Sequence, residues 1–271
     1  MTHSVVLIGC GNMGFAMLTG WVSKDPTLTV HAVEPADQLR MRAADAGAKA
    51  VSNVDELPAD LKPDLIVLAI KPQLIVSVLE CCGALAKSGA TFVSVAAGVS
   101  ISRMMEVLPP GTPIIRSMPN TPVAVGEGMM ALCAGENVSD DVRNLTESLF
   151  SASGAVAWID DEELMDAVTA ISGSGPAYVF HFIEALTSAG TALGLPEDVA
   201  ALMATQTVAG AGKMALTLET SAGVLRQQVT SPGGTTAAAL KVFMDENRLS
   251  DLVLQATTAA RDRGVELGKN R

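Results

Sequence analysis

Short apolar runs alternate with amphipathic stretches along roughly the first 160 residues of the chain. The apolar runs at residues 4–9, 28–34, 64–70 and 91–96 have the length of strands and carry mainly apolar residues at consecutive positions. Consecutive apolar positions indicate strands that are buried on both faces, and strands that alternate with helices favour a parallel sheet. The pattern therefore predicts an α/β fold with a doubly wound parallel sheet covered by helices on both sides.

The pattern changes after about residue 160, where strand-like runs stop and helical periodicity continues alone. Pro176 in the first turn of one such stretch and Gly194 at its end are typical helix start and stop residues. We predict two domains, residues 1–161 with the sheet and an all-α domain over residues 162–271. The helices that we predict in the second domain cover residues 162–171, 176–193, 196–218, 222–228, 235–245 and 251–267.

A glycine-rich turn joins the first predicted strand to the first predicted helix. Its residues are Gly9, Cys10, Gly11, Asn12, Met13 and Gly14. The first glycine permits a tight turn, the second lets the backbone approach a pyrophosphate, and the third lets helix and strand pack closely. Free N–H groups at the helix start would bind the phosphates. The turn predicts a Rossmann-type dinucleotide-binding domain, and the alternative is a merely tight strand-to-helix turn.

An acidic residue, Glu34, ends the second predicted strand, twenty residues beyond Gly14. A carboxylate at this position accepts hydrogen bonds from the ribose hydroxyls of the cofactor and would repel a 2′-phosphate. The residue therefore favours NADH over NADPH. Arg40 and Arg42 stand nearby in the sequence and would soften that preference, so both cofactors remain open.

Three further loops follow predicted strands, where ligands bind in a doubly wound sheet. Lys71 is either a solvated loop lysine or a neighbour of the cofactor, and the small residues at 96–98 would let a nicotinamide ring lie against the backbone. The polar loop at residues 116–122 is the third, and its alternative interpretation is a turn stiffened by proline. The cofactor-binding candidates in the first two loops are Ala69, Lys71, Pro72, Ala96, Ala97 and Gly98.

The helical half holds a second candidate site at residues 229–236, which precede a predicted helix. This segment offers unpaired N–H groups and several hydroxyls but no charged side chain, which suits the binding of a carboxylate. The alternative is a capped helix with a flexible loop. Another glycine-containing loop, at residues 173–178, leads into a helix in the same half.

No lysine occurs between Glu162 and Leu195. Enzymes that reduce a carbonyl with a nicotinamide need a cationic or proton-donating group beside the oxygen. Only His181 and Tyr178 stand in this stretch, and both residue types are more often part of a core. A protonated imine needs no such group, because the substrate already carries the charge. The acidic run at residues 160–163 is best interpreted as a charged first helical turn.

These residues together resemble the pyrroline-5-carboxylate reductase family, whose motifs occur in the same order over nearly the whole chain. The Ser-Pro-Gly-Gly-Thr-Thr block is specific to that family, whereas the glycine-rich turn alone is not. The resemblance implies the last step of proline biosynthesis, in which NAD(P)H reduces 1-pyrroline-5-carboxylate to L-proline by hydride transfer. The segments that carry it are residues 9–14, 71–72, 96–98, 118–122, 172–178 and 225–245.

The resemblance also implies roles for individual residues. The substrate carboxylate would be held by a loop backbone, with the Thr236 hydroxyl near the ring nitrogen and Ser231 as the second catalytic candidate. Gln228 and Asn120 would lie near the nicotinamide end of the cofactor. Family members commonly bind NADPH through a small polar or basic residue after the second strand, where this chain has residues 34–36, Glu-Pro-Ala. The implied substrate-binding residues are Gly233, Gly234, Thr235 and Thr236.

Three other functions compete with this interpretation. A hydroxyacid-type dehydrogenase has a similar two-domain build, and the missing helix lysine speaks against it. A non-catalytic dinucleotide sensor would keep the glycine-rich turn but have no use for the Ser-Pro-Gly-Gly loop. A structural helical oligomer with a vestigial nucleotide domain is disfavoured by the intact cofactor turn.

Composition narrows the partners. The formal net charge of −11 argues against nucleic acid and anionic membranes, which need a basic face. No apolar run approaches the length of a membrane span. The four cysteines and three histidines are not spaced as a disulfide framework or a metal site, so we expect no bound metal and a reducing cytoplasm.

Charge is scarcest in the helical half, where residues 164–218 contain five charged side chains in 55 positions. Helices that are apolar on nearly all faces are buried, and a domain of about 110 residues cannot bury them alone. We therefore expect a homodimer formed through the C-terminal helices. The family resemblance also implies an intertwined dimer, sometimes assembled into a decamer of five dimers. The five charged residues are Asp166, Glu184, Glu197, Asp198 and Lys213.

Overall fold

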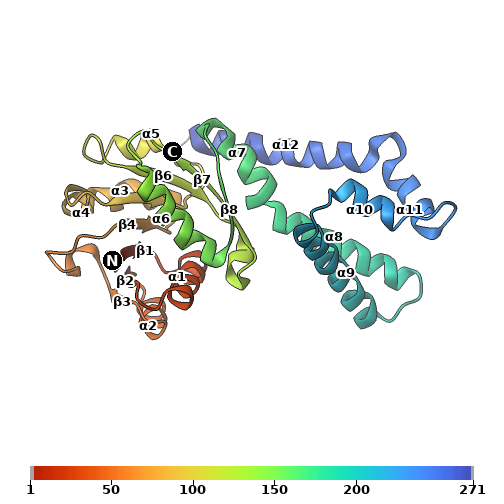
Figure 1. Cartoon of the computed structure of the whole chain (residues 1–271), viewed down its shortest axis with the longest axis horizontal. Helices are drawn as coiled ribbons and strands as arrows, with labels where there is room; N and C mark the ends of the chain where they lie inside the picture. Colours follow the sequence, from red (N-terminus) through yellow and green to blue (C-terminus); the bar gives the residue numbers. More distant parts are fainter. Residues whose placement is uncertain (1–2, 270–271) are drawn as a thin grey trace. The chain divides into compact units, whose positions relative to one another are not determined.

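The computed structural model describes residues 3–269. Its described residues up to Trp158 form an eight-stranded sheet in the order β3-β2-β1-β4-β5-β6-β7-β8 (Figure 1). All neighbours from β3 to β6 are parallel, which confirms the predicted doubly wound arrangement. The strands are β1 (Ser4–Ile8), β2 (Thr29–Val33), β3 (Lys49–Val51), β4 (Leu65–Leu68), β5 (Thr91–Ser94), β6 (Ile114–Met118), β7 (Gly128–Ala134) and β8 (Gly154–Trp158).

One strand departs from the predicted parallel sheet. β7 runs antiparallel to β6, with Ile115 opposite Ala134 and Met118 opposite Ala131. The connection between the two strands holds only a 3₁₀ turn, Thr121–Val125, and a parallel crossover needs a dozen or more residues. The chain therefore turns back directly, and β8 then pairs parallel with β7.

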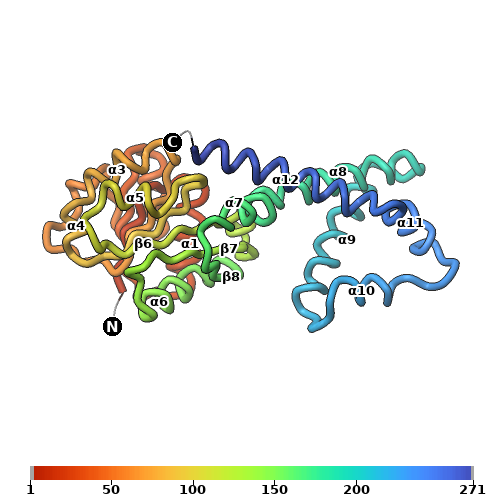
Figure 2. Tube along the Cα trace, turned by 90° about the horizontal axis from the view of Figure 1, so that it is seen from above, coloured from red at the N-terminus to blue at the C-terminus, as the bar shows by residue number. Residues whose placement is uncertain are grey.

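The sheet is covered on both faces, as the continuous apolar strands predict. Successive strand residues point to opposite faces, so Val6 and Ile8 enter one buried cluster while Val5 and Leu7 enter the other. Figure 2 shows α3 and α6 on opposite sides of the sheet. The helices of this part are α1 (Asn12–Lys24), α2 (Asp37–Asp45), α3 (Ile75–Cys81), α4 (Gly83–Lys87), α5 (Ile101–Met105), α6 (Asp140–Phe150) and α7 (Met165–Val168).

Two helical segments are divided in the structure. Residues 72–87 form a 3₁₀ turn followed by α3 and α4, which part at Cys82 with ψ near 10°. The segment predicted at 162–171 becomes a 3₁₀ turn, the short α7 and the π-helical turn Thr169–Gly173. β3 was not predicted, because three residues are too few for an alternating pattern to show.

The chain forms two compact units, one up to Gly173 together with residues from Ala260 onward, and the other Ser174–Ala259. The predicted boundary at 161 and 162 follows the last strand, whereas the units divide after Gly173. The helices after that point are α8 (Gly175–Ala192), α9 (Glu197–Thr217), α10 (Ala222–Gln228), α11 (Thr235–Met244) and α12 (Arg248–Lys269). The last described residues of α12 thus belong to the unit that holds the sheet.

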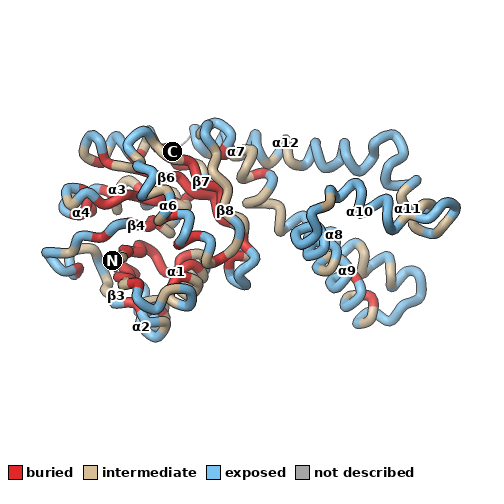
Figure 3. The backbone as a smooth tube through the Cα atoms, viewed as in Figure 1, coloured by how far each residue is buried: buried red, intermediate tan, exposed pale blue. Residues whose placement is uncertain are grey.

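Burial differs sharply between the two units, as the colours of Figure 3 show. The sheet is buried almost throughout, whereas Ala200 and Ala204 are the buried residues of Ser174–Ala259. Large apolar side chains in these helices are exposed, including Leu202 at 70% and Leu216 at 80%. None of the helices within residues 3–269 combines the length and apolar character that crossing a membrane requires.

Candidate active site

The carboxyl ends of β1, β2 and β4 meet at one edge of the sheet, where ligands bind in such folds. A cavity of about 560 Å³ opens there. Five of the predicted cofactor-binding residues line it, which are Gly9, Gly11, Glu34, Ala69 and Lys71. The structure thus brings together residues from three separate loops of the sequence. Sequence reasoning did not single out the other polar lining residues, which are Ser52, Asn53, Asp55 and Cys81.

The three glycines of the turn have different surroundings. Gly9 has φ of +91°, and a Cβ there would lie 2.5 Å from the Ala69 carbonyl oxygen. A Cβ on Gly14 would overlap the carbonyl oxygen of Gly9. A Cβ on Gly11, by contrast, would meet no atom within 4 Å. Gly9 and Gly14 therefore close the turn against β4, while Gly11 leaves bare backbone beside open space at the start of α1.

The start of α1 suits an anion. Gly11 is the N-cap residue, and the first turn contains no acidic residue. The first N–H groups of a helix have no partner within the helix, and the helix dipole favours negative charge there. Asn12, Met13 and Gly14 supply these groups in α1. A pyrophosphate fits this position, since both the bare Gly11 backbone and the helix start face it.

Glu34 is buried at the end of β2 and binds backbone on two sides. Its Oε2 accepts a hydrogen bond of 2.7 Å from the Cys10 N–H, and its Oε1 accepts one of 3.0 Å from the Ala36 N–H. The carboxylate therefore fixes the glycine-rich turn to the end of the second strand. Sequence reasoning assigned Glu34 only to the ribose, because a contact with Cys10 cannot be read from spacing. Burial raises the pKa of the Cys10 thiol to about 11.

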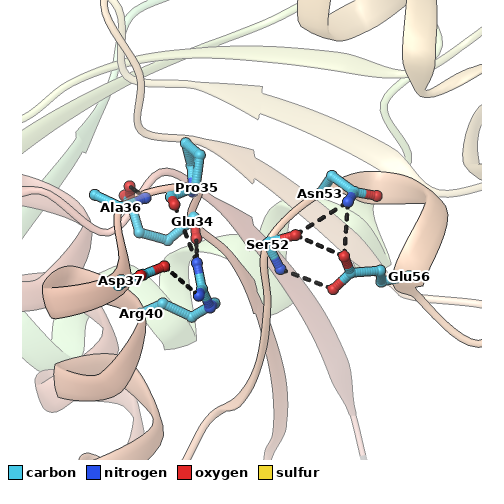
Figure 4. Close-up of polar contacts among 8 residues, drawn as sticks. All are labelled: Glu34, Pro35, Ala36, Asp37, Arg40, Ser52, Asn53 and Glu56. Atoms are coloured by element: carbon cyan, nitrogen blue, oxygen red, sulfur yellow. Dashed lines mark hydrogen bonds and ion pairs between the residues drawn. The ribbon is translucent and has the colours of Figure 1, made fainter.

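Both arginines near Glu34 bond to groups other than its carboxylate. Arg40 Nη1 donates to the carbonyl oxygens of Glu34 and Pro35, each at 3.0 Å, and its Nη2 pairs with Asp37 (Figure 4). Arg42 Nη2 donates to the Cys10 carbonyl oxygen at 3.0 Å, and its guanidinium lies 4.0 Å from the Phe15 ring centroid. Glu34 accepts from the Cys10 N–H and Arg42 donates to the Cys10 carbonyl oxygen, so both side chains hold the glycine-rich turn.

A second polar cluster lies after β3 on the other wall of the cavity (Figure 4). Asn53 caps a 3₁₀ turn by accepting from the Asp55 N–H at 3.0 Å. The Glu56 carboxylate accepts from the Ser52 N–H, from the Ser52 hydroxyl and from the Asn53 side-chain amide, at 2.6–3.0 Å. These bonds, the Ser52 hydroxyl foremost, lower the pKa of Glu56. The Asn-x-x-Glu spacing is a capping signal that could have revealed this cluster.

Other predicted cofactor residues border a second cavity, of about 630 Å³, in the same unit. Pro72 and Gly98 line this cavity, and Ala96, two residues before Gly98, is buried. Its wall includes Arg116, which is almost fully buried and pairs with Glu162 at 3.0 Å. Sequence reasoning placed residues 160–163 in a charged first turn, and it did not foresee this ion pair across 46 positions.

Asn120 has both ends of its side-chain amide engaged. Its Oδ1 accepts from the Met129 N–H at 2.9 Å, and its Nδ2 donates to the Ser172 carbonyl oxygen at 3.1 Å. The side chain therefore ties the loop after β6 to β7 and to the π-helical turn. Its expected position near the nicotinamide stays a prediction, as does that of Ala97 and Gln228.

The predicted substrate loop forms one structural element between α10 and α11. Gly233 has φ of +71°, Gly234 is the N-cap of α11, and no side chain caps the helix. The Gly234 N–H donates to the Ser231 carbonyl oxygen at 3.1 Å. Thr235 and Thr236 therefore stand in the first turn of a ten-residue helix, and Ser231 lies in the loop before it. The free N–H groups of such a helix start suit a carboxylate.

Tyr178 and His181 of α8 lie at the surface of the single chain. Tyr178 is 37% exposed, and His181 is exposed and pairs with Glu184 at 3.0 Å. Their expected place in a core stays a prediction, because Ser174–Ala259 buries few side chains by itself and we expect a partner copy over its helices. Within residues 3–269, no three His, Cys, Asp or Glu side chains gather in a way that could hold a metal ion.

Comparisons with known proteins identify the family of the chain. A family model described as pyrroline-5-carboxylate reductase dimerisation matches residues 162–267, and one described as NADP oxidoreductase, coenzyme F420-dependent, matches residues 4–98. The chain is 39% identical to a pyrroline-5-carboxylate reductase of Pseudomonas aeruginosa, over 99% of this chain and 98% of the relative.

Solved structures give the same result. A pyrroline-5-carboxylate reductase from Coxiella burnetii matches with a TM-score of 0.91 and 38% identity, over 98% of this chain and 99% of that one. The Plasmodium falciparum pyrroline carboxylate reductase, solved with NADP bound, matches with a TM-score of 0.80 and 29% identity over 98% and 99%. The chain therefore belongs to the pyrroline-5-carboxylate reductase family, and it is an NAD(P)H-dependent oxidoreductase that forms L-proline from 1-pyrroline-5-carboxylate.

Proposed function

We propose that the cavity at the ends of β1, β2 and β4 holds the cofactor and that the loop before α11 holds the substrate. The observation that carries the first assignment is the bare Gly11 backbone beside open space at the start of α1. When bound, NAD(P)H supplies a hydride to the C=N carbon of the imine. Gly11 and the helix start would bind the pyrophosphate, and Glu34 the ribose. Ala69, Lys71 and Pro72 would lie beside the cofactor between its two ends. The residues that would meet the nicotinamide end are Ala96, Ala97, Gly98, Asn120 and Gln228.

The substrate assignment rests on a loop that binds anions without a cation. Residues 229–240 contain no charged side chain, so the N–H groups of Gly234, Thr235 and Thr236 and the nearby hydroxyls would hold the carboxylate. Thr236 is proposed to place its hydroxyl near the ring nitrogen, with Ser231 supporting it. Because a protonated imine already carries positive charge, the chain's main contribution is to position substrate and cofactor.

Replacing Thr236 tests this assignment. Thr236→Ala should lower kcat/KM for 1-pyrroline-5-carboxylate by about 10- to 100-fold, the value of a hydrogen bond to a charged group. The Kd for the cofactor should stay unchanged. Thr191→Ala is the matched control, since that hydroxyl bonds only within α8. Wild-type kinetics in Thr236→Ala would remove the loop from the site.

The competing functions separate in one assay of cofactor oxidation at fixed protein. Turnover of the cyclic imine supports the proposal. Turnover of 2-oxo acids alone would mean a hydroxyacid-type dehydrogenase, and cofactor binding without any turnover would mean a sensor. Neither binding nor turnover would mean a structural oligomer.

We further propose that residues 1–161 bind the dinucleotide and that residues 162–271 bind substrate and form the homodimer. The dimerisation family model and the exposed Leu202 and Leu216 support a partner copy over these helices. Light scattering should give at least twice 27.9 kDa, and a decamer of five dimers is the larger assembly to look for. A stable folded monomer would overturn the dimer.

Charge and free thiols support a location in the cytoplasm. All four cysteines are free, as expected of a protein in the reducing cytoplasm. The net charge of −11 offers no basic face for nucleic acid or an anionic membrane. Cell fractionation should therefore recover the enzyme with cytoplasmic markers, and recovery with the membrane fraction would contradict this placement.

A further inference from the structure

We infer that Glu34 is a specificity-determining residue that excludes the 2′-phosphate of NADPH, so that NADH is the preferred cofactor. The inference rests on the proposed placement of the cofactor in the cavity at the ends of β1, β2 and β4. In that placement the adenosine ribose meets the end of β2, where Glu34 stands. Three features of the surrounding residues carry the inference.

The end of β2 presents a carboxylate rather than a donor. Glu34 is buried and held at both oxygens, so it cannot swing aside to admit a phosphate. The Ala36 N–H, a backbone donor just after the strand, already donates to Glu34 Oε1. Each carboxylate oxygen keeps a second lone pair, which can accept a bond from a ribose hydroxyl. The site thus suits a hydroxyl and opposes an anion.

Both nearby arginines already bond to protein groups. Arg40 is held by two carbonyl oxygens and the Asp37 carboxylate. Arg42 is directed to the Cys10 carbonyl oxygen and stacks on Phe15. The positively charged side chain in the cavity lining is Lys71. It follows β4, which lies on the other side of β1 from β2, so it is placed toward the pyrophosphate.

The side-chain donors that Ser52 and Asn53 supply on the facing wall are engaged. The N–H and hydroxyl of Ser52 and the amide of Asn53 all donate to Glu56. Asp55 adds a further carboxylate to the lining. A 2′-phosphate would therefore meet a carboxylate on each wall, Glu34 and Asp55, while the side-chain donors of Ser52 and Asn53 are engaged by Glu56 (Figure 4).

Direct binding measures the effect without catalysis. Titrating the dimeric protein with NADH and with NADPH in a calorimeter, at fixed ionic strength, should give a Kd for NADPH at least about tenfold higher. A carboxylate beside a dianionic phosphate at about 6 Å produces a difference of this order. An equal or lower Kd for NADPH would overturn the inference.

Variants locate the effect. Glu34→Gln removes one charge and should narrow the ratio of the two Kd values at least about fivefold. Glu56→Gln, at an exposed site, should narrow it less and in the same direction, and it provides the test if Glu34→Gln does not fold. Asp60→Asn removes the same charge from an exposed loop outside the cavity and should leave the ratio unchanged. A ratio that neither Glu34→Gln nor Glu56→Gln moves would overturn the role of these carboxylates.

The outcome is separable from the proposed function. NADH that binds tightly without turnover of the imine would refute the proposed reaction and leave the cofactor preference intact. Turnover of the imine with equal kcat/KM for both cofactors would refute the preference and leave the reaction intact.

Discussion

Gly11 and Gly14 stand three residues apart in one turn. A methyl group added at Gly14 should lower the stability of the fold, whereas one added at Gly11 should weaken cofactor binding. In Gly14→Ala the new Cβ would overlap the Gly9 carbonyl oxygen and lie 3.1 Å from its carbon and 3.2 Å from the Ala69 Cβ. All three neighbours are backbone or β-carbon atoms, so the turn itself must move. In Gly11→Ala the methyl group would meet no protein atom, and φ of −62° suits alanine.

The magnitudes follow from these distances. Overpacking of this kind costs about 1–3 kcal/mol, and a domain of this size loses about 2–4 °C of Tm per kcal/mol. Gly14→Ala should therefore melt about 2–12 °C below the wild type. Gly11→Ala should melt within about 2 °C of it, since alanine also restricts the unfolded chain. Its methyl group occupies the space that the pyrophosphate needs, so its Kd for NADH should rise at least about tenfold.

Thermal unfolding and NADH titration of both variants check the pair. Protomer concentration must be fixed, because association shifts the Tm of an oligomer. A Gly14→Ala protein with the wild-type Tm would refute the packing argument. A Gly11→Ala protein that binds NADH normally would refute the placement of the pyrophosphate.

Three other predictions concern charge and thiols. Burial lowers the pKa of His31 below 6.5, so folding favours the neutral imidazole. The stabilising contribution should be complete above about pH 6.5 and should be lost as the pH drops below that value. The urea midpoint should therefore fall between pH 7.5 and pH 5.5, and it should fall less in His31→Val. Native protein at pH 8 should take up one maleimide per chain, at the exposed Cys81. Saturating NADH should slow this labelling, as followed by mass spectrometry, because the Cys81 thiol lines the proposed cofactor cavity. Glu162→Gln leaves buried Arg116 unpaired and should cost about 2 kcal/mol in urea unfolding, whereas Glu106→Gln, from an exposed pair, should cost less than about 0.5 kcal/mol; equal costs would contradict the burial argument.

The sequence predicts the elements that local pattern determines. β4 is a continuous apolar run, and β1 is one after its first residue, because both of their faces are buried, and the glycine-rich turn needs its residues at fixed spacing. The direction of β7 was missed because it depends on the short connection after β6.

Contacts between distant positions are beyond the reach of local pattern. Glu34 and Cys10 meet across 24 positions, and Arg116 and Glu162 across 46. Only the folded sheet brings these pairs together. The residue types at positions 34 and 162 reveal a charge, but the partner decides whether that charge positions a backbone turn or stabilises a buried arginine.

The path of the chain has a consequence for the order of folding during synthesis. The sheet-containing unit closes only with residues after Ala260, where Gly264 lies against Asp166 and Gly268 against the backbone of Gly98. A ribosome must therefore translate the whole helical segment before the first unit receives its last piece. Domains usually fold in order as they emerge. Here the nascent sheet should wait for the last turns of α12 to leave the exit tunnel, and a stop codon shortly before that helix ends would leave the sheet-containing unit incomplete.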